Sequence, residues 1–121
     1  MERLARLYAA RNQISRTIAR TPGRDQLFSE VCRTLVEVAG FRMAWIGWYD
    51  AAADHLLPAA FWGEGSGTPR PLPVDDPNAG PTVRAFRDRQ PFISNDLLAD
   101  LPSPAREEVA ARGLRSGAIL P

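Results

Sequence analysis

The sequence of 121 residues contains no lysine, and all 15 of its basic residues are arginine. The absence of lysine excludes Schiff-base chemistry, phosphate-loop lysines and kinase-type catalysis within this chain. The single cysteine, Cys32, allows neither an internal disulfide nor a cysteine-rich zinc site, and a reducing compartment is expected. No apolar run reaches the roughly 18 residues of a membrane span, and residues 1–10 lack the hydrophobic stretch of a signal peptide. We therefore predict a small soluble domain located in the cytoplasm.

An excess of charge of one sign is also lacking, because 15 basic residues face 14 acidic residues and leave a net charge of +1. No strong field draws the chain to nucleic acid or to acidic lipid, so neither nucleic acid nor a membrane is expected as a partner. The content of 45% hydrophobic and 24% charged residues is ordinary for a globular protein with one core.

Residues 3–20 have the pattern of a helix, in which Arg11 interrupts a heptad-like stripe formed by Leu4, Leu7, Ile14 and Ile18. A basic amphipathic helix can lie on a membrane, but this requires a wide apolar face with large aromatics, and Tyr8 is the only aromatic residue here. The pattern therefore favours a narrow stripe that pairs with a partner helix. We expect residues 1–22 to form a linking helix through which a homodimer assembles.

Residues 24–39 form the clearest amphipathic helix of the sequence. Apolar residues recur every three or four positions, at Phe28, Val31, Cys32, Leu35 and Ala39. Gly40 follows as the expected C-terminal stop. A reactive thiol needs exposure and a positive neighbour, so Cys32, in the middle of the stripe, is best interpreted as a packed small hydrophobic residue.

The pattern changes period after Gly40. Residues 41–49 are aromatic and β-rich on both alternating faces, which predicts a central strand that is covered on both sides. Residues 50–54 form a turn, and residues 56–62 return as a second strand, which Pro58 places at a sheet edge or a bulge. The short connection indicates an antiparallel hairpin.

Residues 63–79 show no periodicity and predict a long loop without an element of its own. Pro81 opens a short helix through Arg87, and residues 91–94 form a short strand. Ser103 and Pro104 cap a further helix that ends at Gly113, and residues 115–120 begin a last strand. Because a strand in this position needs a following element to cover it, we expect the chain to be part of a larger domain and a larger protein.

Groups for catalysis are scarce. The only histidine, His55, is expected in an exposed hairpin turn, where it has only Asp54 beside it and completes neither a metal site nor a nucleophilic triad. The glycines of residues 63–67 lack the lysine and the following helix of a phosphate loop. Asp75 and Asp76 are explained as solvated turn residues. We expect no catalytic residue, no metal site and no enzyme activity in this chain.

Groups for binding are more frequent. Four of the ten aromatic residues, Trp45, Trp48, Phe61 and Trp62, lie in two adjacent predicted strands. These rings could enclose a cavity for a small ligand beside the long loop, although packing in the core is favoured for any single ring. Asn95 and Asp96 could orient a ligand, but capping of the backbone is the favoured role.

The order of these segments resembles a bacterial GAF domain. The resemblance covers about residues 25–121 and rests on four segments: GFRMAWIG at 40–47, GPT at 80–82, PFISND at 91–96 and GLRSGAILP at 113–121. It implies an α+β fold with a central antiparallel sheet, helices on both faces and a ligand pocket, in which residues 23–121 form the domain and the last strand and closing helix are absent. Similar domains belong to multidomain signalling proteins, commonly sensor histidine kinases or cyclic-dinucleotide enzymes, and a dimerising helix often precedes them.

Departures from the family pattern leave the ligand unidentified. Without lysine, the Asn-Lys-Phe-Asp-Glu signature of cyclic-nucleotide-binding relatives is absent. Cys32 lies outside the pocket region where bilin-binding relatives attach pigment, methionine-sulfoxide-reducing relatives use several cysteines, and His55 is badly placed for a haem ligand. No cofactor is therefore identified, and the pocket would take an unknown small molecule. The candidates for lining it are Trp45, Phe61, Trp62, Thr82, Phe86, Asn95, Asp96 and Ser116.

Three functions follow as hypotheses. The first is a non-catalytic sensory module that binds a small molecule and passes the change to a covalently linked output domain. The second is a ligand-free module that dimerises and holds two output domains together. The third, a free-standing enzyme, is disfavoured because the sequence offers no set of nucleophile, base or metal ligands.

Overall fold

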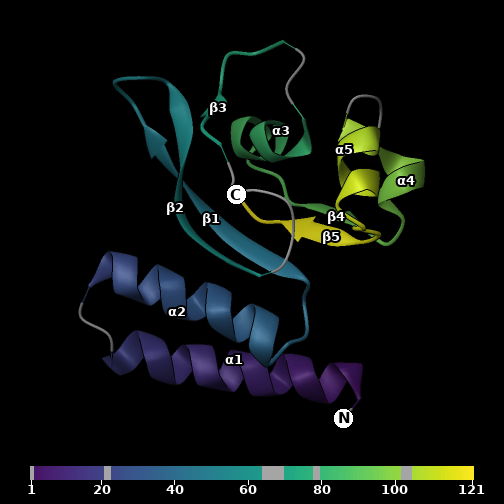
Figure 1. Ribbon diagram of the computed structural model, residues 1–121. Coiled ribbons are helices and arrows are strands. Elements are labelled where there is room, and N and C mark those ends of the chain that lie inside the picture. The colour runs from purple at the N-terminus through teal and green to yellow at the C-terminus, as the bar shows by residue number, and fades with distance from the viewer. Residues whose placement is uncertain (1, 21–22, 64–69, 78–79, 102–104) are drawn as a thin grey trace. The chain divides into compact units, whose positions relative to one another are not determined.

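The computed structural model describes residues 2–20, 23–63, 70–77, 80–101 and 105–121 (Figure 1). The chain divides into two compact units, one made of Met1–Trp48 and Leu57–Arg70 and the other of Tyr49–Leu56 and Pro71–Pro121. Helices combine with antiparallel strands, so the predicted α+β class is confirmed. The described strands are divided between two sheets, of three and of two strands.

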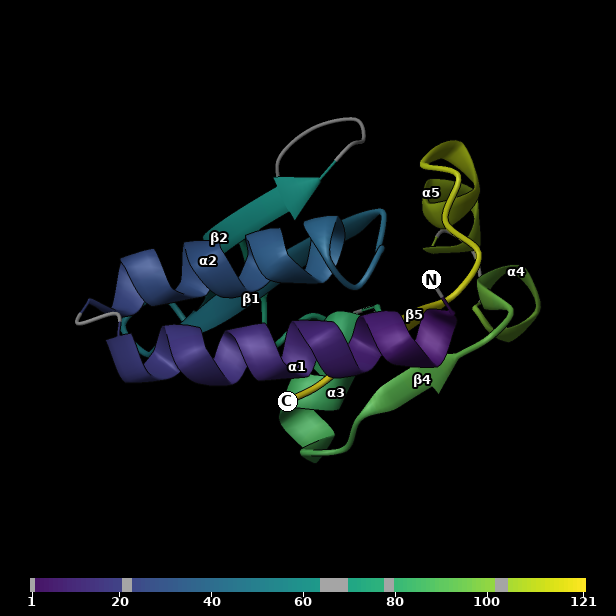
Figure 2. The same cartoon turned by 90° about the horizontal axis from the view of Figure 1, so that it is seen from below.

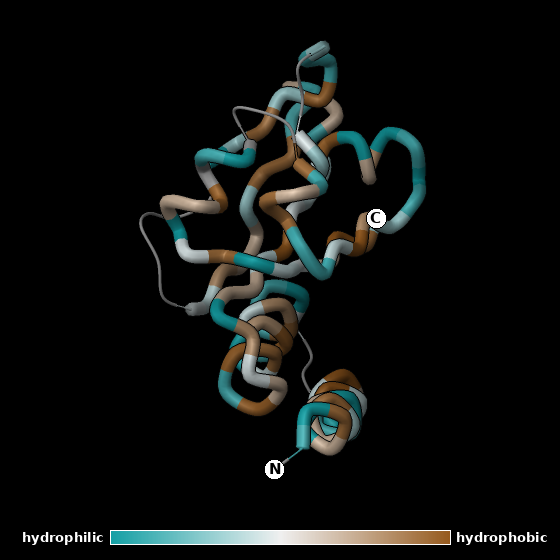
Figure 3. The backbone as a smooth tube through the Cα atoms, turned by 90° about the vertical axis from the view of Figure 1, so that its right-hand side faces the viewer, coloured by the Kyte–Doolittle hydropathy of each residue, from teal (hydrophilic) through white to brown (hydrophobic). Residues whose placement is uncertain are grey.

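Two antiparallel helices open the first unit, α1 (Arg3–Arg20) and α2 (Arg24–Glu37), and they lie side by side (Figures 1 and 2). Figure 3 shows hydrophobic and hydrophilic positions interleaved along both helices. The buried residues of α1 are Ala10 and Thr17, and α2 buries Thr34. Each threonine hydroxyl donates to a carbonyl oxygen one turn earlier, of Gln13 and Glu30 respectively, at 2.9 Å. The small side chains can therefore be buried without an unsatisfied hydroxyl.

As predicted, Gly40 follows the end of α2, but the helix ends at Glu37, two residues before the expected end. Gly40 has φ +89°, in the left-handed region that favours glycine. The Nε of Arg6, on α1, donates to the carbonyl oxygen of Val38 at 3.4 Å, and the Arg6 guanidinium occupies the space that a side chain at Gly40 would fill. Cys32 is fully buried, which confirms its interpretation as a packed small residue.

The three-stranded sheet has the order β1-β2-β3, with β1 at Met43–Asp50, β2 at His55–Gly63 and β3 at Leu72–Pro73. The hairpin turn is confirmed, but the central strand among the described residues is β2 and not β1. As a whole, β2 is therefore not an edge strand, but the described pairing with β3 ends at Leu56, before Pro58. Pro58 is tolerated because β3 pairs only with His55 and Leu56, so no bond to β3 is required of the proline nitrogen.

The expected loop over residues 63–79 is wrong in one respect, because β3 lies within it; residues 64–69 and 78–79 are outside the described part. The two residues of β3 form a strand because they pair with His55 and Leu56. The Val74 amide adds a hydrogen bond of 3.0 Å to the carbonyl oxygen of Asp54. Such pairing joins distant positions and leaves no periodic signal in the sequence.

The second unit contains four further elements close to their predicted places: α3 (Pro81–Asp88), β4 (Phe92–Ser94), α5 (Ala105–Ala111) and β5 (Gly117–Ile119). As predicted, α3 begins with a proline in its first turn. Strands β4 and β5 pair antiparallel. A single helical turn, α4 (Leu97–Asp100), was not predicted, and the predicted cap at residues 103–104 lies outside the described residues.

Candidate functional site

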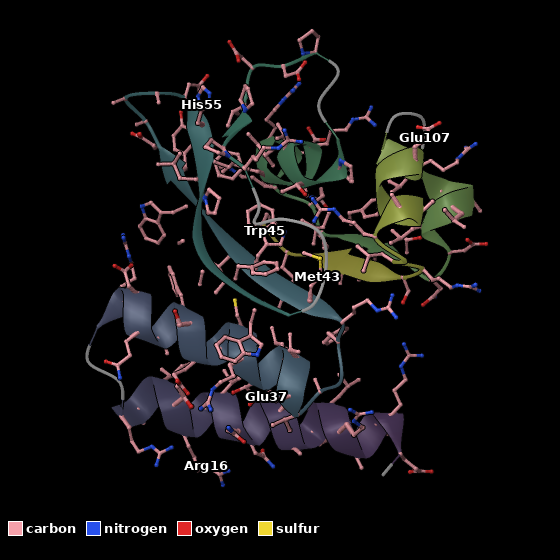
Figure 4. The ribbon with its side chains drawn as sticks, in the orientation of Figure 1. Arg16, Glu37, Met43, Trp45, His55 and Glu107 are labelled. Atoms are coloured by element: carbon pink, nitrogen blue, oxygen red, sulfur yellow. The ribbon has the colours of Figure 1, made fainter. Side chains whose placement is uncertain are left out.

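The aromatic residues of β1 lie on opposite faces of the strand. The Trp48 ring lies 5.8 Å from the Phe28 ring of α2, and the Arg24 guanidinium stacks 4.3 Å above it. Because neighbouring residues of a strand alternate between its faces, Trp45 lies on the face opposite Trp48. Trp45 is half-buried on β1 (Figure 4), so of these two tryptophans it is the one that does not pack against α2.

Phe61 and Trp62 are consecutive residues of β2 and therefore point to opposite faces of the sheet. Phe61 is half-buried and Trp62 is exposed. One face of the sheet can thus receive only one of these two rings, although both are candidates for the predicted pocket.

Thr82 and Phe86 are one helical turn apart on α3 and share a face of that helix. The Phe86 ring lies 5.2 Å from the ring of Tyr49, and the Tyr49 hydroxyl donates to Oδ1 of Asp54 at 2.6 Å. The hydrogen bond to this carboxylate is the main reason why the pKa of Tyr49 is raised above its ordinary value. Phe86 is therefore fixed against an ordered aromatic neighbour.

The polar candidates after β4 serve the backbone. The Asp96 carboxylate accepts from the Ala99 amide at 3.3 Å and caps α4, which confirms the favoured capping interpretation. The buried Ser94 hydroxyl donates to Oδ2 of Asp100 at 2.6 Å and accepts from the Asp96 amide at 3.1 Å. Asn95 is exposed, as is Ser116, which precedes β5.

Of the eight pocket candidates, Trp45, Phe61 and Trp62 belong to the first unit and the other five to the second. Within the second unit, the structure brings Thr82 and Phe86 onto one helix face and commits Asp96 to a cap. The pocket formed by all eight residues stays a prediction.

A hollow that the sequence analysis did not predict lies at the C-terminal end of α3. Its volume is about 480 Å³, and Phe86, Arg87, Arg89 and Pro121 line it. Nη1 of Arg87 donates to the carbonyl oxygens of Val74 at 3.4 Å and Asp76 at 3.3 Å. The available sequence signal was the pair of arginines at the end of the helix, but only the fold brings Pro121 to them.

The described residues contain no group of three or more His, Cys, Asp or Glu side chains that could hold a metal ion. His55 differs from expectation, because it is the half-buried first residue of β2 and not a residue of an exposed turn. Its Nδ1 lies 2.5 Å from the carbonyl oxygen of Ala53. Among the described helices, none combines the length and apolar character that crossing a membrane demands.

Helices and antiparallel strands in this order, with aromatic rings along a hairpin, define the class of small α+β domains. Comparison with family models then gives the family: the model of the GAF domain matches residues 21–121, and the chain belongs to this family. GAF domains are sensory and regulatory modules.

Among solved structures, the chain is similar to a crystal structure of residues 122 to 287 of a methyl-accepting chemotaxis protein. The two share 28% sequence identity with a TM-score of 0.68, over 93% of this chain and 73% of that chain. The curated proteins contain no match.

Proposed function

We propose that this chain is a non-catalytic sensory module of a bacterial multidomain signalling protein in the cytoplasm. It binds a small molecule and transmits the change to a covalently linked output domain, of the histidine-kinase or cyclic-dinucleotide type. The observation that carries the proposal is the match to the GAF family over residues 21–121. The similarity to a segment of a chemotaxis protein supports a role in signal transduction.

The ligand would lie against the face of β1 that carries Trp45. One observation supports this choice. Trp45 is on the face of β1 opposite Trp48, which packs on α2.

A thermal-shift screen over nucleotides and small metabolites tests ligand binding. A ligand at 100 times its dissociation constant adds about 2.7 kcal/mol to the free energy of unfolding. Trp45→Ala should abolish the shift, whereas Phe41→Ala, at an exposed position outside the candidate set, should leave it unchanged. A broad library without a single stabilising compound would contradict this function.

The second candidate function is ligand-free dimerisation through α1. The observation in its favour is an exposed seam on α1, defined by Leu4, Leu7, Tyr8 and Ile18, whose exposed fractions are 59%, 40%, 55% and 58%. Isolated exposed apolar residues are normal, but four on one helix are typical of a surface that meets a partner.

Sedimentation equilibrium tests the dimer. Leu7→Glu should shift the protein to a monomer, because it places a charge inside the seam. Ala5→Glu is the matched control, because Ala5 is exposed on α1 and lies outside the seam. A monomeric parent protein, or equal effects of both substitutions, would exclude association through this seam.

A further inference from the structure

The hollow at the C-terminal end of α3 combines two kinds of wall. The phenyl ring of Phe86 is apolar and flat, the pyrrolidine ring of Pro121 is apolar, and the side chains of Arg87 and Arg89 are cationic. Figures 1 and 2 both place the C-terminal end of the chain beside α3. The volume of about 480 Å³ falls within the range of roughly 300–1,000 Å³ that small-molecule sites occupy.

Two of the four lining side chains are held in place before any ligand arrives. Nη1 of Arg87 donates to the carbonyl oxygens of Val74 and Asp76, which hold the guanidinium near the segment after β3. The Phe86 ring packs against Tyr49, which is itself bonded to Asp54. A surface that is already ordered loses little conformational entropy when it binds.

Arg89 contributes the second cation from an unusual backbone. It caps α3 with φ 54° and ψ 38°, in the left-handed region, and its amide donates to the carbonyl oxygen of Ala85. Glycine is the usual residue at such a helix end, because a side chain there is strained. Strain of this kind often accompanies a side chain that serves a site. In this chain, Arg89 has the strained backbone, and its side chain lines the hollow.

We propose that the hollow binds an anion that carries a flat apolar group, such as an aromatic phosphate or carboxylate. The guanidinium groups of Arg87 and Arg89 bind the anionic end, because their planar N–H donors match phosphate and carboxylate oxygens. The flat group packs between Phe86 and Pro121. This site shares only Phe86 with the pocket predicted from the sequence, and it does not depend on the sensory function proposed above.

Titration of the ¹⁵N-labelled full chain with phenyl phosphate tests the site, with inorganic phosphate and phenol as comparison ligands. Phenyl phosphate should shift the amide signals of residues 86–89 in a saturable manner. Each comparison ligand should bind at least about tenfold more weakly, because each lacks one half of the recognised group.

Two variants on the same helix separate the site from general charge. Arg89→Gly removes the guanidinium and suits the left-handed backbone, so it should weaken phenyl phosphate binding about tenfold or more without lowering the melting temperature. Arg84→Gln removes an exposed arginine that does not line the hollow, and it should leave the affinity unchanged.

Three results would overturn the proposal. One is the absence of a saturable shift at residues 86–89. Another is equal affinity for phenyl phosphate and inorganic phosphate, which would mean an adventitious ion only. The third is an equal loss of affinity in Arg84→Gln and Arg89→Gly, which would mean attraction by net charge alone.

Discussion

Gly40→Ala perturbs the turn that ends α2. At φ +89° an alanine pays about 1–2 kcal/mol for the left-handed backbone. Its methyl group would also meet the Arg6 guanidinium, which must then move and lose its bond to the Val38 carbonyl oxygen. That bond is long, at 3.4 Å, so its loss adds about 0.5 kcal/mol. We expect the free energy of unfolding to fall by about 2 kcal/mol in total.

Urea unfolding followed by circular dichroism measures this loss, and a thermal scan should show the midpoint lowered by about 8 °C for a chain of this size. A double-mutant cycle with Arg6→Ala separates the two causes. In the Arg6→Ala background, the cost of Gly40→Ala should shrink to the backbone part alone. A loss of less than about 0.5 kcal/mol in the parent chain would refute the left-handed turn at Gly40.

Three further predictions concern single side chains. The raised pKa of Tyr49 means that its contribution to stability is complete below about pH 10 and is lost as the pH rises through the folded pKa. In a Tyr8→Phe background, absorbance at 295 nm should show Tyr49 titrating at lower pH once Asp54→Asn removes the carboxylate. Burial raises the pKa of Cys32, so Ellman's reagent should modify it only on unfolding, and rapid modification of the native protein would contradict its burial. Arg89→Gly should raise the free energy of unfolding by about 0.5–1 kcal/mol in urea, because it relieves a left-handed backbone; a net loss would show that this backbone is unstrained.

The elements that the sequence predicts well are those whose signals are local. The bounds of α1 agree with the helical pattern of residues 3–20, Gly40 turns the chain after α2, and Pro81 opens α3. Each signal is a property of one residue or of a few neighbours, such as a left-handed preference or a missing amide hydrogen. Such signals act regardless of what the rest of the chain does.

The elements that it misses depend on distant partners or are too short for a period. β3 has two residues and pairs with His55 and Leu56, which lie at least 16 positions earlier. α4 is one turn long, so no apolar stripe can identify it, although Asp96 is a recognisable cap. The order of strands in the sheet is likewise a tertiary property, and it places Pro58 in a central strand that the sequence alone assigns to a sheet edge or a bulge.

The candidate site shows the same division. Aromatic content and strand period suffice to propose Trp45, but they do not tell which of Phe61 and Trp62 shares its face. The hollow at α3 forms only where Pro121 lies beside residues 86–89. The pairing of β4 with β5 allows Pro121 to reach this position. The left-handed backbone of Arg89 could not be predicted, because nothing in the sequence marks an arginine that adopts this conformation.

The packing of α1 explains why the seam of Leu4, Leu7, Tyr8 and Ile18 remains exposed. Close approach of α1 and α2 uses the small side chains Ala10 and Thr17, and successive residues of a helix are about 100° apart, so Ile18 faces a different direction from Thr17. Each large aliphatic residue of the seam would contribute about 1.5–3 kcal/mol if fully buried against a partner. Arg11 and the other arginines of α1 oppose a second copy by like-charge repulsion, which at exposed positions is weak and is screened by salt. Because screening weakens this repulsion and leaves the apolar contribution unchanged, we expect any association of two α1 helices to strengthen as ionic strength rises.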